Sequence, residues 1–327
     1  MGLIIYYLFL PALFAVLLGI VGLLFYKYVI VYSTLHRRYF KDKNVQKLCI
    51  YARHGKTDKI KQLLKDGVDI NTQGKEGVTP LTWLMIFSFT TKKALKGFKY
   101  LLENGADPLI VFKKADDYNA FQIACMLKSP KYLEILLDVY KPTKEELNIT
   151  SDKYSNDTSL SVAIFYDRFK QFKMLIDYGA DVNWSDSNNS NLLNDNGYKW
   201  KYAYHLLKAG ADWRSVSKFN KEEFKKTNTP DYIARIEREK KPSLIIAENN
   251  GVDYFQKVIS FLKKQGAEFK LNLDPKEEYR KVNGKEVLFI KENNNWIEYK
   301  KSNQYKKDLK MFKPTIMERI GEFFGVM

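Results

Sequence analysis

Few side chains in this 327-residue chain are suited to catalysis or metal binding. The only histidines are His36, His54 and His205, and the only cysteines are Cys49 and Cys125. Catalytic and metal-binding motifs bring such groups together at short, regular spacing, but the sequence contains no G-x-S-x-G, H-E-x-x-H, C-x-x-C or glycine-rich phosphate loop. We therefore expect no catalytic residue, no metal site and no cofactor, and the protein is predicted not to be an enzyme.

The composition is typical of a folded chain with a basic surface. Hydrophobic residues make up 45% of the chain, with only 9 prolines and 2 cysteines, which excludes a disordered chain, a collagen and a disulfide scaffold. The net charge of +16 would attract nucleic acid, an anionic membrane or an acidic protein. Lys and Arg are dispersed and mixed with Glu, as in Lys221-Glu222-Glu223, without the concentrated stripe of a nucleic-acid-binding protein. We expect no nucleic-acid partner and no small-molecule substrate.

The N-terminal segment has the composition of a membrane span. Residues 2–26 contain no charged side chain, and the apolar run continues through Val31 after the single Lys27. About 20 apolar residues suffice to cross the hydrocarbon core of a bilayer. A cleaved signal peptide would carry an early Lys or Arg and a small-residue cleavage site, which this segment lacks. The sequence predicts a transmembrane helix over residues 1–33 that contacts membrane lipids, followed by a basic juxtamembrane linker over residues 34–43.

The orientation of this single-pass membrane protein follows from the charges beside the span. Basic residues cluster directly after it, at Lys27, Arg37, Arg38, Lys41 and Lys43. The positive-inside rule therefore predicts that the soluble part of the protein lies in the cytoplasm.

A short pattern recurs through the soluble part: a pair of large apolar residues, two or three further residues, then Gly, then Ala or Val, then Asp or Glu. Gly67 and Gly105 in two copies are 38 residues apart, and Gly179 and Gly210 in two others are 31 apart. A fifth copy contains Gly266, and the weaker Ile135-Leu136-Leu137-Asp138 fills the gap after the second. Periods of this size are typical of stacked structural repeats.

The repeat region, residues 44–271, resembles ankyrin repeats. Gly77-Val78-Thr79-Pro80-Leu81-Thr82 matches the start of the ankyrin first helix, and the Gly-Ala/Val-Asp/Glu tails match the end of the repeat. The resemblance implies an all-α repeat solenoid of five or six repeats, the last ones degenerate, with Asn191-Leu192-Leu193 opening the fifth. We expect Thr79 to cap a helix whose first turn holds Pro80, and the tail glycines to adopt the left-handed conformation that ends helices.

Residues 272–327 form a C-terminal extension to the repeats. Strand-forming residues at 285–291 and 296–300 flank residues 292–295, which predicts a β-hairpin. The alternation of basic and apolar residues at 311–327 predicts a short amphipathic helix.

The repeat register also places the two cysteines. Cys49 falls on the first helix of the first repeat and Cys125 on that of the third. Neighbouring helices stack roughly 8–10 Å apart, whereas a disulfide needs Cα atoms about 5.5 Å apart. We predict two buried free thiols.

Ankyrin-type stacks bind partners through loop tips and the concave face of the first helices, so the resemblance implies a partner surface. The register places one outward-facing pair on each first helix, and three of the four pairs are apolar or aromatic where a solvated face would be polar. The predicted partner-binding residues are Arg53 and His54, Ile86 and Phe87, Met126 and Leu127, Phe165 and Tyr166, with Lys75, Glu76, Tyr118 and Trp184 at loop tips. Two alternatives remain open. The groove is filled by the C-terminal extension or by an insertion at Lys92–Lys96, or the register shifts by one and these residues belong to the core.

Two functions fit these features. The first is a membrane-anchored module that captures a partner protein near the membrane without catalysis. The second follows from the anchor, the divergent repeats and the insertion before Phe98-Lys99-Tyr100-Leu101-Leu102, an arrangement that resembles bacterial ankyrin immunity proteins of type VI secretion lipase toxins. That resemblance implies a lipase toxin as partner, a bacterial inner membrane, and a periplasmic location for the repeats, opposite to the side given by the positive-inside rule.

Overall fold

The computed structural model describes most of the chain after the predicted membrane span. The described residues are 36–88, 90–151, 157–185, 190–196, 199–221, 225, 230, 232–233, 236, 254–268, 277–283, 285–303 and 305–307. The predicted span at 1–33 and the predicted helix at 311–327 lie outside them. Among the described residues, no helix is both long enough and apolar enough to traverse a bilayer. The chain divides into two compact units, Met1–Ala180 and Asp181–Met327, which are described in turn.

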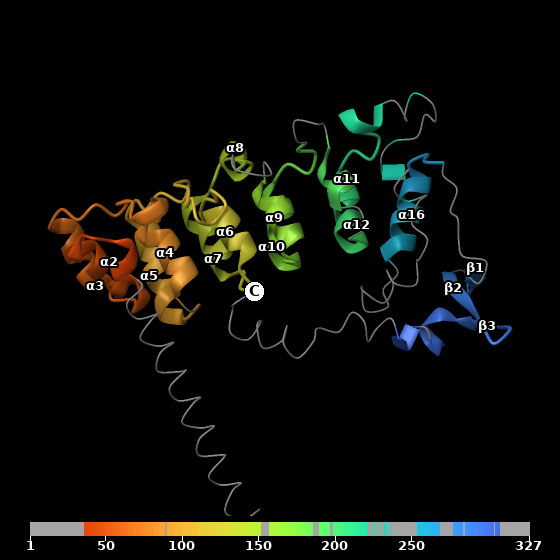
Figure 1. Cartoon of the computed structure of the whole chain (residues 1–327), viewed down its shortest axis with the longest axis horizontal. Coiled ribbons are helices and arrows are strands. Elements are labelled where there is room, and N and C mark those ends of the chain that lie inside the picture. Colours follow the sequence, from red (N-terminus) through yellow and green to blue (C-terminus); the bar gives the residue numbers. More distant parts are fainter. Residues whose placement is uncertain are drawn as a thin grey trace, which may run out of the picture. The chain divides into compact units, whose positions relative to one another are not determined.

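The first unit contains four helix pairs side by side (Figure 1). The pairs are α2 (Lys43–Arg53) with α3 (Thr57–Lys65), α4 (Pro80–Phe87) with α5 (Lys92–Glu103), α6 (Ala120–Met126) with α7 (Lys131–Ile135), and α9 (Ser159–Phe165) with α10 (Phe169–Tyr178). A 3-10 turn, η1 (Lys75–Gly77), precedes α4, a π-helical turn, η2 (Leu136–Tyr140), continues α7, and α8 (Lys144–Leu147) follows it. The first helices α2, α4, α6 and α9 pack on one another in succession. The predicted helical repeat architecture is therefore confirmed.

Each repeat starts with a polar residue that caps its first helix. Before α4, the Thr79 hydroxyl accepts a hydrogen bond from the Thr82 amide at 3.2 Å, and the Thr79 amide donates to the Thr82 hydroxyl at 3.0 Å. This is a capping box with Pro80 in the first turn, as predicted. Asn119 and Gln122 form the same arrangement at α6. The capping box is thus retained at the start of the third repeat, although its residues differ from those of the second.

The Gly-Ala/Val-Asp tails end the first, second and fourth repeats by two local effects. Gly67, Gly105 and Gly179 have φ angles of 85°, 90° and 103°, which confirms the predicted left-handed conformation. The following aspartate then starts a turn, since the Asp69 carboxylate accepts a hydrogen bond from the Asn71 amide at 2.9 Å.

Asparagines in these tails link one repeat to the next. The Asn71 side chain donates to the Gly105 carbonyl at 3.0 Å and accepts from the Asp107 amide at 2.8 Å. In the second unit, Asn183 makes the equivalent bonds to Gly210 and Asp212 at 3.2 and 2.7 Å. These side chains therefore fix the spacing between neighbouring tails.

The segment before the first repeat differs from the predicted juxtamembrane linker. Residues 36–39 are helical, and His36, Tyr39 and Phe40 are buried. The Tyr39 ring stacks on Phe87 with centroids 4.8 Å apart, and the His36 ring meets Trp83 edge-on at 6.2 Å. The rings of His36 and Tyr39 thus pack against α4 of the second repeat. This segment therefore belongs to the folded unit.

The second unit holds a further helix pair, another helix and a small sheet. Its elements are α11 (Leu192–Asn196), α12 (Trp200–Lys208), η3 (Lys218–Asn220), α16 (Tyr254–Lys264), β1 (Glu277–Val282), β2 (Lys285–Glu292), β3 (Asn295–Glu298) and η4 (Tyr299–Lys301). Asn191 caps α11, because its side-chain oxygen accepts from the Asn194 amide at 3.0 Å. Trp200 of α12 meets Phe255 of α16 edge to face at 4.8 Å, and both are buried.

The predicted hairpin is confirmed and is part of a larger sheet. Strands β2 and β3 pair antiparallel across a turn at Asn293 and Asn294, both with positive φ. Strand β1 pairs with the other edge of β2, giving the order β1-β2-β3. The sequence did not predict β1, because its letters EEYRKV are mostly charged.

The two cysteines are where the register predicted them, and both are free and buried. Burial raises the pKa of each thiol well above its ordinary value, because a thiolate would lose its hydration there. Cys49 and Cys125 are therefore core residues of α2 and α6.

Helices α2 and α5 approach closely at a glycine. A Cβ atom added at Gly97 of α5 would lie 1.9 Å from the carbonyl oxygen of Ala52 on α2. No side chain fits at that distance, so any substitution at Gly97 must push the first two repeats apart.

Gly97→Ala is therefore expected to destabilise the protein. Its free energy of unfolding should fall by about 2 kcal/mol, although Ala is favoured over Gly in an exposed helix by about 1 kcal/mol. Lys96→Ala, at an exposed position of the same helix, serves as the control. Chemical unfolding of the full-length variants checks this, and equal stability of the two variants would show that the helices do not make this contact.

Candidate partner-binding surface

The eight residues predicted on the first helices occupy equivalent places in four consecutive repeats. Each pair lies at the C-terminal end of a first helix: Arg53 and His54 at α2, Ile86 and Phe87 at α4, Met126 and Leu127 at α6, Phe165 and Tyr166 at α9. Because these helices pack in succession, the eight residues mark the ends of four neighbouring helices, and together they are called here the helix-end row. None of the eight is fully buried: His54 and Phe165 are exposed, and the other six are half-buried.

Side chains from neighbouring repeats hold the row in place. The last carbonyl groups of a helix lack partners within it, and a donor from elsewhere can satisfy them. Arg53 Nη2 donates to the Phe87 carbonyl at 2.7 Å, and Arg168 Nε donates to that of Met126 at 3.1 Å. Gln171 Nε2 donates to the Leu127 carbonyl at 2.7 Å. Sequence reasoning missed Arg168 and Gln171, although both lie close to the start of a second helix that must pass these helix ends.

The α9 end of the row is apolar and exposed. Phe165 is 71% exposed, more than any other large hydrophobic side chain among the described residues. Its ring meets that of the half-buried Tyr166 edge to face, with centroids 5.1 Å apart. A partner that covered Phe165 would gain roughly 2 kcal/mol from burying the ring. This pair is the strongest candidate for an apolar anchor point.

Phe87, in contrast, is less exposed to a partner than the sequence predicted. Besides Tyr39, it contacts Phe112 edge-on at 6.5 Å, and it is half-buried. These rings come from the segment before α2 and from a loop, which the repeat pattern does not cover. Lys92–Lys96 is also not an insertion that fills a groove, because these residues form the start of α5.

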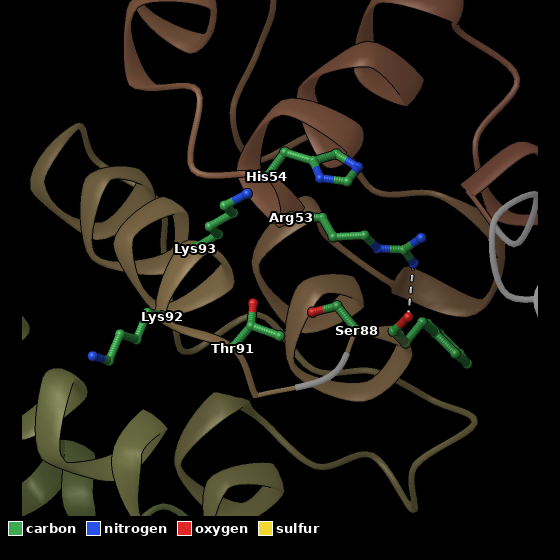
Figure 2. A pocket seen from close by; sticks show the side chains of 7 residues that line it. Arg53, His54, Ser88, Thr91, Lys92 and Lys93 are labelled. Carbon is green, nitrogen blue, oxygen red and sulfur yellow. Dashed lines mark hydrogen bonds between the residues drawn. The ribbon is translucent and has the colours of Figure 1, made fainter.

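The α2 end of the row borders a cavity of about 520 Å³ (Figure 2). This basic cavity is lined by Arg53, His54, Phe87, Ser88, Thr91, Lys92 and Lys93. The Arg53 guanidinium lies 4.6 Å from the centre of the Trp83 ring and is bonded to the Phe87 carbonyl. In Figure 2, Lys93 extends toward the helix end that carries His54, whereas Lys92 points away from it. The described lining residues include three cations and no carboxylate.

The positive charge of the cavity is reflected in the titration of His54. Partial burial lowers the pKa of His54, and the positive charges of Lys56, Arg53 and Lys93 lower it further. Each of these effects disfavours the imidazolium form. Together they favour the neutral imidazole.

The predicted loop-tip residues differ from one another in exposure. Lys75 and Glu76 are exposed on η1, and Trp184 is half-buried in the second unit. Tyr118 is only 5% exposed, and its hydroxyl donates to the Asp157 carboxylate at 2.8 Å. Burial and the Asp157 charge raise the pKa of Tyr118. The tyrosine thus joins two loops and is not a tip contact, which corrects its assignment.

The chemical groups on this surface are suited to binding. In the part of the chain that the structure describes, no three or more His, Cys, Asp or Glu side chains are grouped as they would be to hold a metal ion. The helix-end row offers an exposed aromatic ring at one end and the Arg53 and Lys93 cations at the other.

The fold and this surface belong to a stack of helical repeats, and sequence comparison identifies the class. The profile described as "Ankyrin repeats (3 copies)" matches residues 84–186. This range holds the second repeat from within α4 onward, the third and the fourth. Residues 84–186 therefore match ankyrin repeats.

Two individual proteins are similar to the chain. Alpha-latrotoxin-Lg1a of Latrodectus geometricus is 25% identical over 120 residues, which are 37% of this chain and 8% of the toxin. The chain thus spans less than a tenth of the length of this relative. Among solved structures, the ankyrin repeat domain of Bcl-3, a member of the IkappaB protein family, has a TM-score of 0.47 and 17% identity, covering 65% of this chain and 85% of that one.

Removing one cation from the cavity should change the titration of His54. Lys93→Ala is expected to raise the pKa of His54, because less positive charge then opposes the imidazolium form. NMR titration of the histidine ring protons, assigned with His54→Gln, measures the change. Lys96→Ala removes the same charge farther along α5 and should leave the pKa of His54 nearly unaltered. If the two variants shift it equally, Lys93 does not act locally.

Proposed function

We propose that the protein is a non-catalytic module that binds another protein along the helix-end row. Ankyrin repeats are protein-interaction modules, and the row lies at the ends of four first helices that pack in succession. The observation that carries the proposal is Phe165, a large aromatic side chain 71% exposed beside Tyr166. An exposed aromatic ring of this kind is costly in water and is typical of the residues that dominate protein interfaces.

Phe165 also makes the proposal testable. Because its side chain is exposed, a substitution there can change binding without unfolding the protein. Phe165→Asp removes apolar contact area and places a charge where the partner would bury the ring, with little effect on the core. We expect the amount of partner captured by the tagged full-length chain to fall at least about tenfold, which corresponds to roughly 1.4 kcal/mol. Quantitative mass spectrometry of the captured proteins measures it.

Tyr178→Asp is the matched control. Tyr178 is a 36% exposed aromatic residue on α10, the second helix of the same repeat, and lies outside the row. This variant should capture the partner as the unaltered chain does, and thermal unfolding should show both variants folded. Equal capture by the two variants would contradict a binding role for the row.

We further propose that residues 1–33 anchor the protein in a membrane, with the repeats on the cytoplasmic side. The support is the absence of charge from residue 2 to residue 26 and the basic residues that follow. A membrane tether would raise the effective concentration of the repeats toward a partner at the same surface.

Membrane extraction tests the anchor. The full-length protein should stay with membranes in alkaline carbonate, while a variant lacking residues 1–33 should be released. Release of both would contradict the anchor. A reporter fused to the C-terminus gives the side of the membrane, and a periplasmic signal would overturn the cytoplasmic assignment.

The alternative proposal is an immunity protein that neutralises a type VI secretion lipase toxin. It is supported only by the order of an apolar N-terminal segment followed by divergent repeats. It requires the repeats to face the periplasm of a bacterium and the captured partner to be a lipase. A cytoplasmic reporter signal or a partner without lipase activity would exclude it.

A further inference from the structure

The basic cavity at the α2 end of the row is a second recognition feature, distinct from the apolar contact at Phe165. Its volume of about 520 Å³ is large enough to admit side chains of another molecule. Its wall is mostly apolar, the Arg53 and Lys93 cations supply positive charge beside it, and its described lining residues include no carboxylate. A recess lined with charge of one sign favours a ligand group of the opposite sign.

The Arg53 charge is held in a fixed position. The hydrogen bond to the Phe87 carbonyl and the Trp83 ring beneath the guanidinium define where it lies. A charge that is already ordered loses less conformational entropy on binding than a flexible one. Lys93 is exposed and extends toward His54, so it can adjust to what enters (Figure 2).

The charged groups that act on His54 have the same sign as those beside the cavity. The three charges that act on the His54 imidazole belong to Lys56 and Arg53, at the end of α2 and just after it, and to Lys93 on α5, and all are positive. An anionic group placed among them would be attracted by each, and it would favour the protonated form of His54.

We infer that the basic cavity receives a carboxylate-bearing segment of the partner protein, rich in Asp or Glu. This inference rests on the proposed function. A protein segment is favoured over a lipid headgroup because Arg53, His54 and Phe87 belong both to the cavity and to the helix-end row. A polypeptide lying along the row can therefore place acidic side chains in the cavity and apolar ones against Phe165.

The probe for this inference is a capped Asp/Glu peptide, Gly-Asp-Glu-Phe-Glu-Asp-Gly, compared with its Asn/Gln counterpart. Binding to the full-length chain is followed by NMR at the His54 ring up to about 10 mM peptide, a concentration that reveals even weak charge contacts. We expect the acidic peptide to bind and to raise the pKa of His54. The neutral peptide should do neither, and added salt should weaken the binding.

Two charge reversals on one helix test whether the cavity is responsible. Lys93→Glu should weaken binding of the acidic peptide roughly tenfold, since one attractive charge becomes repulsive. Lys96→Glu makes the same change in net charge at an exposed position outside the cavity lining and should have less than about a twofold effect. Absence of any His54 response, equal binding of both peptides, or equal effects of both reversals would overturn the inference.

Two further measurements separate the possible sources of failure. If vesicles containing phosphatidylglycerol bind in a Lys93-dependent way and the acidic peptide does not, the cavity recognises lipid phosphate and the inference is wrong. Lys93→Glu should also reduce capture of the partner. If capture is unchanged although the acidic peptide binds in the cavity, the inference fails while the function proposed from Phe165 stands. If Lys93→Glu reduces capture of the partner and Phe165→Asp does not, the proposal that the partner contacts Phe165 is wrong.

Discussion

A helix pair of this size cannot bury its own apolar face, and the structure depends on that constraint. Helix α6 has only seven residues, and six of them are buried, so neighbouring repeats must cover it. Stacking leaves polar groups at each boundary, and side chains of adjacent repeats satisfy them, as Asn71 does for the tail of the second repeat. The stack is therefore held by contacts between repeats, and these contacts also produce a continuous surface of helix ends.

Arg53 shows how the same contacts prepare a binding surface. Its guanidinium joins the first two repeats through the Phe87 carbonyl and the Trp83 ring, and the same group gives the cavity its fixed positive charge. At the α9 end of the row, Phe165 is 71% exposed, and its ring meets that of Tyr166 edge to face. The row thus combines a rigid charged end with an apolar end that is available for contact.

The sequence predicted those features that depend on local conformation. Thr79, Pro80 and the tail glycines were correctly placed because capping and left-handed backbone act within a few residues. Phe87 and Tyr118 were predicted to face outward, but aromatic stacking and a hydrogen bond to Asp157 join them to segments far away in the chain. The inter-repeat links were accessible from the pattern, since Asn71, Asn183 and Arg214 each stand four residues after a tail glycine, and Arg214 donates to the Gln265 carbonyl.

The central claim is that a protein partner contacts the ends of the first helices. Hydrogen exchange of the full-length chain, measured alone and in complex with its captured partner, tests it most directly. The account predicts added protection in the segments that follow α2, α4, α6 and α9, around residues 53–56, 86–90, 126–129 and 165–168. Protection confined to the second helices α3, α5 and α10, with these segments exchanging as in the unbound protein, would contradict it.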